Sequence, residues 1–256
     1  MNIRTIAKMA AAGVLAAAGS ASTAADSVKN VVLVHGAWAD GSSWSKIIPL
    51  LEERGLHVVA VQNPLTSLAD DVAATKRVID AQDGSVVLVG HSYGGAVISE
   101  AGNNPKVARL IYVAAFGPDT GESVATTAKD FAAPPVASEV RPIADGFLVL
   151  TKKGVSEDFA QDLSSLEKRV LAATQAPTSG SVFAVGMTDA AWRNKPAWYI
   201  VAENDRMINP DYERFAAKRM GAKTLSLSTS HVPMLSKPKE VAAFIAGAAA
   251  GHSSSD

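Results

Sequence analysis

The chain contains no cysteine. Disulfide bonds, thiolate catalysis and zinc sites with sulfur ligands are therefore all excluded. The histidines and acidic residues show no spacing typical of a metal site, so we expect no metal ion. Without cross-links or metals, the stability of the fold has to come from a hydrophobic core.

An excess of charge of either sign is also missing. The 24 basic residues are balanced by 25 acidic ones, and lysine and arginine form no cluster along the chain. Nucleic acid and anionic membrane surfaces are therefore not indicated as partners. A small neutral substrate fits this composition better, and the sequence says nothing about the oligomeric state.

Hydrophobic runs of membrane-spanning length are absent. The apolar run at residues 9–19 follows a basic start and is about half the length that crosses a bilayer. Small side chains at residues 20–25 suit a signal peptidase. We therefore expect a signal peptide over residues 1–25 and no stable membrane anchor, which predicts a periplasmic or secreted protein.

The rest of the chain alternates short apolar runs with helical patterns. The short run Asn30–His35 is typical of a strand buried on both faces. Further strands are predicted at His57–Gln62, Ser85–Gly90, Val107–Ala115, Pro196–Ala202 and Lys223–Leu227. Helical spacing predicts helices over residues 43–54, 67–81 and 238–249. This alternation predicts a mainly parallel sheet with helices on both faces, in an α/β core built from residues 26–116 and 196–250.

Residues 117–195 break the alternation. Several prolines interrupt helical pieces such as residues 157–173. We expect this insertion to form a small helical cap over a pocket, since loops at the carboxyl edge of a parallel sheet reach over that edge. Residues 251–256 are small and polar, which predicts a disordered tail.

Residues 90–94 match the G-x-S-x-G pattern, which lifts a serine out of a sharp turn between a strand and a helix. Glycines are needed on both sides because side chains there would collide with neighbouring backbone. The pattern alone is weak, but here an apolar strand precedes it and a helical segment follows it. We therefore expect Ser92 to be a nucleophile rather than part of a chance glycine-rich turn.

A serine hydroxyl needs a base to remove its proton, and the base needs an orienting acid. We expect His231 to be the base because it follows the last strand, on the sheet edge that carries the serine. Structural roles explain the other histidines better: His35, His57, His91 and His252. Asp205 and Glu203 both fit the expected order of serine, acid and histidine; Asp205 is preferred because it lies further into the loop, and Glu203 stays open.

Backbone N–H groups are also needed to bind the oxyanion that forms during acyl transfer. One is expected from Tyr93, the residue after the nucleophile. The second is expected from Ala37, in the loop after the first strand, where Gly36 allows close approach. Trp38 in the same loop is expected to line the substrate pocket. This mechanism requires no cofactor.

The motifs around these residues resemble those of a known family. They are HGAWADGSSW at residues 35–44, GHSYGG at 90–95, ENDRMINP at 203–210 and SHVPMLSKP at 230–238. They are similar to motifs of the small α/β hydrolases that include plant methyl esterases, hydroxynitrile lyases and bacterial esterases. The resemblance implies the α/β-hydrolase fold. It assigns the triad and the oxyanion donors to Ser92, Asp205, His231, Ala37 and Tyr93.

Two positions distinguish esterases from lyases in that family. The lyases carry a threonine at the position of Gly36 and a lysine at that of Val232. Because this chain has Gly36 and Val232 instead, the resemblance favours hydrolysis of a small-molecule carboxylic ester. It implies room beside Gly36 for the ester that the serine attacks. The alternatives are a lyase or perhydrolase that uses the same triad, and a non-catalytic relative that binds a ligand.

Overall fold

The computed structural model describes residues 27–251. The expected signal peptide at residues 1–25 lies outside this range, as does the expected tail beyond residue 251. Within the described range, no helix combines the length and the apolar character needed to cross a membrane.

Six parallel strands form the central sheet, in the order β2-β1-β3-β4-β8-β9. They are β1 (Asn30–Val34), β2 (His57–Ala60), β3 (Val86–Ser92), β4 (Val107–Ala115), β8 (Ala197–Ala202) and β9 (Lys223–Leu227). Each corresponds to one of the apolar runs in the sequence. The predicted parallel sheet is confirmed.

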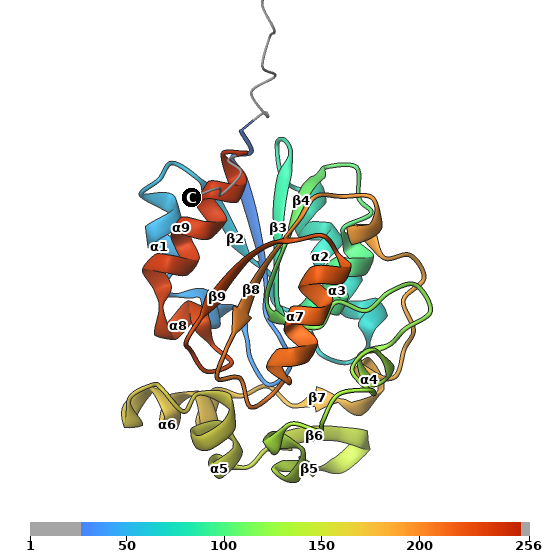
Figure 1. Ribbon diagram of the computed structural model, residues 1–256, viewed down its shortest axis with the longest axis vertical. Coiled ribbons are helices and arrows are strands. Elements are labelled where there is room, and N and C mark those ends of the chain that lie inside the picture. Colours follow the sequence, from blue (N-terminus) through green and yellow to red (C-terminus); the bar gives the residue numbers. More distant parts are fainter. Residues whose placement is uncertain (1–26, 252–256) are drawn as a thin grey trace, which may run out of the picture.

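Helices cover both faces of this sheet (Figure 1). One side carries α1 (Ile48–Glu52), α8 (Pro233–Ser236) and α9 (Pro238–Ala249), and the other carries α2 (Leu68–Asp80), α3 (Gly94–Ala101) and α7 (Pro210–Arg219). The helix predicted for residues 43–54 is shorter than expected. A 3₁₀ turn, in which the Asp40 side chain accepts from the Ser42 N–H, precedes it, and Pro49 is tolerated only in the first helical turn.

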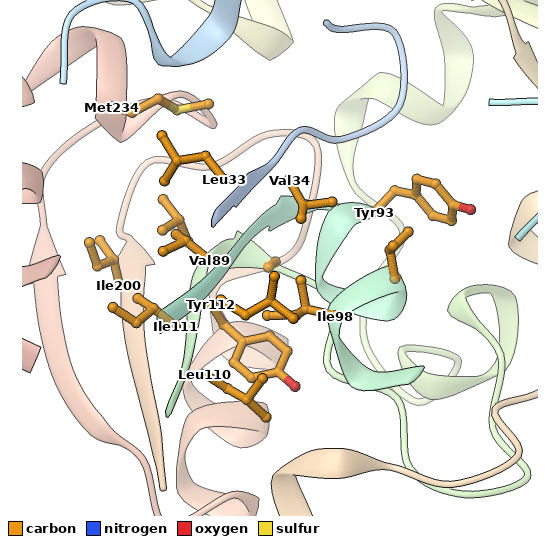
Figure 2. Close-up of a cluster of buried hydrophobic side chains, with 14 of the residues drawn as sticks. Leu33, Val34, Val89, Tyr93, Ile98, Leu110, Ile111, Tyr112, Ile200 and Met234 are labelled. Carbon is orange, nitrogen blue, oxygen red and sulfur yellow. The ribbon is translucent and has the colours of Figure 1, made fainter. Parts of the chain in front are cut away.

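The core lies on both sides of the central strands because helices exclude water from both faces. Leu33, Val89 and Ile111 come from three adjacent strands and are fully buried, as Figure 2 shows. Ile98 of α3 is equally buried and packs in the same cluster. Close packing of this kind leaves little freedom, so the ends of β1 and β3 are held in fixed positions.

The direction in which the chain adds strands to the sheet changes between β1 and β3. The chain runs from β1 outward to β2 and then returns to β3 on the other side of β1. Loops that leave β1 and β3 therefore diverge to opposite faces, and a crevice opens between them at the carboxyl edge. The loop of residues 36–38 and the expected nucleophile Ser92 both lie at this edge.

The part of residues 117–195 from α4 to β7 lies at the same edge of the sheet, and the chain then returns along the side of the core to the start of β8 (Figure 1). This part contains α4 (Val124–Thr127), β5 (Val140–Pro142), β6 (Phe147–Leu150), α5 (Lys152–Gly154), α6 (Ser165–Thr174) and β7 (Thr178–Ser179). Strands β5, β6 and β7 form a small antiparallel sheet that the sequence did not predict.

The helix predicted over residues 157–173 is divided. A π-helical turn covers Val155–Phe159, and α6 begins only after Ser164. Ser164 and Glu167 cap each other's backbone N–H groups, which starts a new helix at this point.

Candidate active site

Ser92 is the last residue of β3, and α3 begins two residues later. Its φ angle is +55°, in the left-handed region that non-glycine residues rarely adopt. Such strain persists only where the surrounding structure enforces it, and it occurs often at functional sites. The sharp turn expected from the sequence pattern is therefore present at Ser92.

The glycines around Ser92 are required by close backbone approaches. A Cβ atom at Gly90 would lie 2.6 Å from the Gly94 carbonyl oxygen, and one at Gly94 would lie 2.6 Å from the Val34 carbonyl oxygen. Gly95 is more restricted still, because a Cβ there would overlap with the Phe116 carbonyl oxygen. Gly90 and Gly94 are thus required for the steric reason expected from the sequence pattern, and Gly95 is required for the same reason.

Gly36 faces the nucleophile directly. A Cβ atom at this position would lie 2.6 Å from Ser92 Cβ and 3.2 Å from Ser92 Oγ. The expectation of room beside Gly36 for an attacking ester is therefore wrong, since the turn at Ser92 places the serine side chain in that space. The two residues that differ from the lyases are unchanged by this: position 36 is glycine, and Val232 is a buried apolar residue.

His231 and Asp205 form a buried pair. The distance from His231 Nδ1 to Asp205 Oδ2 is 2.5 Å, and both side chains have no exposed surface. Asp205 Oδ1 accepts the backbone N–H groups of Met207 at 2.6 Å and Ile208 at 2.9 Å. Three donors thus hold the carboxylate in place, and its charge favours the tautomer of His231 that carries a proton on Nδ1.

Glu203, the alternative acid, lies elsewhere. Its backbone N–H donates to the carbonyl oxygen of Leu227 in β9, so the hydrogen bonding between β8 and β9 continues for one residue beyond the end of β8. Its carboxylate is partly exposed and forms an ion pair with Arg214. The structure therefore brings Asp205, and not Glu203, to His231.

A hydrogen bond to its backbone carbonyl also holds His231 in place. His91 donates from Nε2 to the His231 carbonyl oxygen at 2.8 Å, and the two rings lie 4.7 Å apart. Burial lowers the pKa of His91 well below its usual range, so this ring is neutral. Sequence reasoning assigned His91 a structural role but missed that it joins the turn at Ser92 to the loop at His231, because the two are 140 residues apart.

The second ring nitrogen of His231 remains available. Its Nε2 atom is buried and has no hydrogen-bond partner among residues 27–251. The backbone N–H groups of Ala37 and Tyr93 likewise have no acceptor in the described part of the chain. Groups without a partner are available to bind a ligand or to take part in a reaction.

His35 supports the loop that contains Ala37. Its Nδ1 donates to the Gly36 carbonyl oxygen at 2.9 Å, and its Nε2 accepts the Asn63 N–H at 2.9 Å. Burial lowers the pKa of His35, which keeps the ring neutral and able to accept. This contact also escaped the sequence analysis, which assigned His35 only to the end of the first strand.

A cavity of about 260 Å³ opens beside Ser92. Trp38, expected to line the pocket, lies in its wall, and the Trp38 Nε1–H is bound to the Leu148 carbonyl oxygen of the cap at 3.0 Å. The other lining residues are apolar: Ala37, Phe116, Val124, Ala125, Val136, Val140, Leu148, Phe183, Met207 and Ile208. The hydroxyl of Ser92 thus lies in a described lining that is otherwise apolar.

The side chain of Tyr93 is anchored by a buried carboxyl. Tyr93 donates its hydroxyl proton to Asp71 Oδ2 at 2.8 Å, and Asp71 Oδ1 accepts the Leu65 N–H at 2.8 Å. Burial outweighs these hydrogen bonds and raises the pKa of Asp71 to about 6. Asp71 therefore supports the residue that follows the serine, a role that no sequence pattern indicated.

Because of its raised pKa, Asp71 should stabilise the folded protein more at low pH than at neutral pH. Between its usual pKa of 3.8 and about 6, Asp71 keeps a proton when folded and releases it when unfolded. The contribution of Asp71 to the unfolding free energy should therefore fall by about 2–3 kcal/mol as the pH rises from about 4 to about 6. Urea unfolding at several pH values should show this part of the pH dependence in the wild type and not in the variant Asp71→Asn.

Asp70→Asn is the matched control in the same helix. Asp70 is exposed, and its hydrogen bonds with Ser67 and Thr66 lower its pKa, so its contribution has the opposite sign. The control should keep the fall between pH 4 and 6. An unchanged pH profile in Asp71→Asn would contradict the assignment.

The chain matches the alpha/beta hydrolase family over residues 31–244. This range covers most of the chain, so the protein belongs to the alpha/beta hydrolase family. The fold and the family resemblance expected from the motifs are both confirmed.

Its relatives make it an esterase-type hydrolase. Methylesterase 8 of Arabidopsis thaliana is 26% identical over 239 residues, which cover 82% of this chain and 86% of that protein. Pyrethroid hydrolase of Sphingobium wenxiniae is 27% identical over 261 residues, covering 86% and 87%. The crystal structure of a pyrethroid hydrolase from Sphingobium faniae has the same fold, with a TM-score of 0.75 at 23% identity over 87% of this chain and 97% of that one.

Proposed function

We propose that this protein is a serine esterase that cleaves a small, uncharged carboxylic ester through an acyl-enzyme intermediate. Ser92 is the nucleophile, His231 the general base and Asp205 the orienting acid. The backbone N–H groups of Ala37 and Tyr93 bind the oxyanion.

In the first half of the reaction, Ser92 Oγ attacks the ester carbonyl carbon and His231 Nε2 takes the hydroxyl proton. The carbonyl oxygen becomes an oxyanion at the two free N–H groups, each of which contributes about 3 kcal/mol to transition-state stabilisation. His231 then donates the proton to the departing alcohol. In the second half, water attacks the acyl-enzyme by the same steps and releases the acid.

The observation that carries the proposal is the orientation of His231. Asp205 occupies Nδ1, which leaves Nε2 as the atom that can accept a proton. Nε2 is buried and unpartnered within the described chain, and the His231 ring lies against His91, the residue before the strained serine. A base that is oriented and left free in this way is what a serine nucleophile requires.

The cavity beside Ser92 supports an uncharged substrate. Its described lining contains no charged side chain, and burial of an unpaired charge there would cost several kcal/mol, on the order expected for an unpaired ion in an apolar site. The names of the relatives, methylesterase and pyrethroid hydrolase, agree with ester cleavage. We also propose that the mature protein acts in the periplasm or outside the cell, on the basis of the signal expected at residues 1–25.

Labelling with a fluorophosphonate tests the proposal. Mass spectrometry of digested protein should find one adduct, on the peptide that contains Ser92, and the variant Ser92→Ala should give none. Ser99→Ala is the matched control, because Ser99 is buried in α3 and bound to the Gly95 carbonyl and the Tyr112 hydroxyl. It should label like the wild type.

Turnover of short-chain p-nitrophenyl esters should accompany the label. An adduct on a different serine would contradict the assignment of the nucleophile. No adduct and no turnover would favour a non-catalytic relative that binds its ligand without cleaving it.

A further inference from the structure

A second carboxyl group is buried behind the pair of Asp205 and His231. Glu213 lies on α7 and has no exposed surface. Its Oε2 atom accepts the backbone N–H of Ala202 at 2.9 Å, and the carbonyl of the same residue accepts the N–H of Asp205 at 3.1 Å. Glu213 and Asp205 are thus attached to the same residue at the end of β8.

The Glu213 carboxyl has no donor for its other oxygen. Oε1 finds no N–H or O–H partner among residues 27–251, and no basic side chain in that range forms an ion pair with Glu213. Its charged neighbour is the Asp205 carboxyl, whose negative charge acts on Glu213. Two carboxyl oxygens can form a hydrogen bond only if one of the groups carries a proton.

The surroundings place that proton on Glu213. Asp205 accepts three hydrogen bonds, two from backbone N–H groups and one from His231, so both of its oxygens already serve as acceptors. Glu213 accepts one. Burial, reinforced by the negative charge of Asp205 and, more weakly, of Glu203, raises the pKa of Glu213 well above its usual range.

The other titratable groups near the pair do not supply a positive charge. Tyr199 of β8 and Tyr212 of α7 are buried and neutral, because burial raises the pKa of each. Arg214, the next residue of α7, is directed to Glu203 and Asp211 at the surface, and Arg206, the residue after Asp205, is directed to Asp158. A neutral Glu213 is therefore the arrangement that satisfies this cluster.

We propose that Glu213 is a positioning residue for ester hydrolysis: as a neutral carboxylic acid it donates a hydrogen bond to Asp205 and holds that carboxylate in the orientation that faces His231. This role rests on the proposed function, in which Asp205 orients the base. Glu213 does not touch the substrate. It acts through Asp205, and the hydrogen bond also draws negative charge away from the oxygen that faces the imidazole.

Two variants separate this role from simple filling of space. Glu213→Gln keeps an oxygen for the Ala202 N–H and an amide N–H for Asp205, so it should preserve the arrangement. Glu213→Met has a similar volume but no donor. Without the donor, more negative charge faces His231, which favours the protonated imidazole and moves the ascending limb of the pH profile of kcat/KM to higher pH.

For Glu213→Gln we expect kcat/KM within about threefold of the wild type and an ascending limb within about 0.3 pH unit. For Glu213→Met we expect kcat to fall about tenfold and the limb to rise by about half a unit to one unit. A limb that moves down by about one unit in Glu213→Gln would show that Glu213 is ionised in the wild type, which overturns the proposal. A folded Glu213→Met with the wild-type profile would overturn it equally.

Infrared spectroscopy tests the protonation state without turnover. At neutral pH the wild type should show the carbonyl stretching band of a protonated carboxylic acid, and Glu213→Gln should lack it. A wild type without this band would overturn the proposal, even if Glu213→Met fails to fold. If the band is present but Ser92 takes no fluorophosphonate label, the proposed function fails while the carboxyl pair stands.

Discussion

Replacing His231 by alanine is expected to lower kcat/KM for a p-nitrophenyl ester by roughly four to six orders of magnitude. The reason is that the Ser92 hydroxyl would keep its proton, while the oxyanion donors and the cavity would still bind the ester. Steady-state kinetics with a short acyl chain measure the effect. Because the side chain is fully buried, a thermal unfolding curve should accompany the assay to show that the variant is folded.

His57→Ala is the matched control for this loss. His57 is exposed at the start of β2, on an edge strand at the opposite end of the sheet from the carboxyl edge. Its replacement should leave kcat/KM unchanged. A loss of less than about tenfold in His231→Ala would show that another group removes the proton, since a general base alone contributes more than that.

The variant Gly95→Ala should destabilise the protein by about 3 kcal/mol or more. The added methyl group would overlap with the carbonyl oxygen of Phe116, and its other neighbours, the Phe116 carbonyl carbon and the Ala115 Cβ, are not ends of flexible side chains that could move away. Either α3 or the end of β4 would have to shift. Since α3 follows Ser92 directly, the activity should fall together with the stability.

Gly247→Ala is the opposite case in α9. A Cβ atom there would meet no atom within 4 Å, and the backbone is helical. This change should stabilise the protein by about 0.5–1 kcal/mol, because alanine loses less backbone entropy than glycine on folding. Urea unfolding of both variants provides the comparison, and equal stabilities would contradict the steric account of Gly95.

The core was predictable because its signals are local. The four central strands, β1, β3, β4 and β8, are short apolar runs, and such runs are the strands that helices cover on both faces. The turn at Ser92 was predictable for a similar reason, since its glycines are required by contacts within a few residues and with the adjacent strand. The structure of the cap was harder to predict from the sequence. Its strands β5, β6 and β7 are short and only half-buried, so their pairing depends on the rest of the fold rather than on a sequence pattern of their own.

The sequence by itself determined the class of fold and the sharp turn that strains Ser92. Only the tertiary structure decided that Asp205 rather than Glu203 meets His231, and that the space beside Gly36 belongs to Ser92. It alone revealed the supporting contacts of His91 and Glu213. The physical reason is distance along the chain: these contacts join residues from separate strands and loops, and no local pattern of hydrophobicity or charge encodes which of them meet once the sheet has formed.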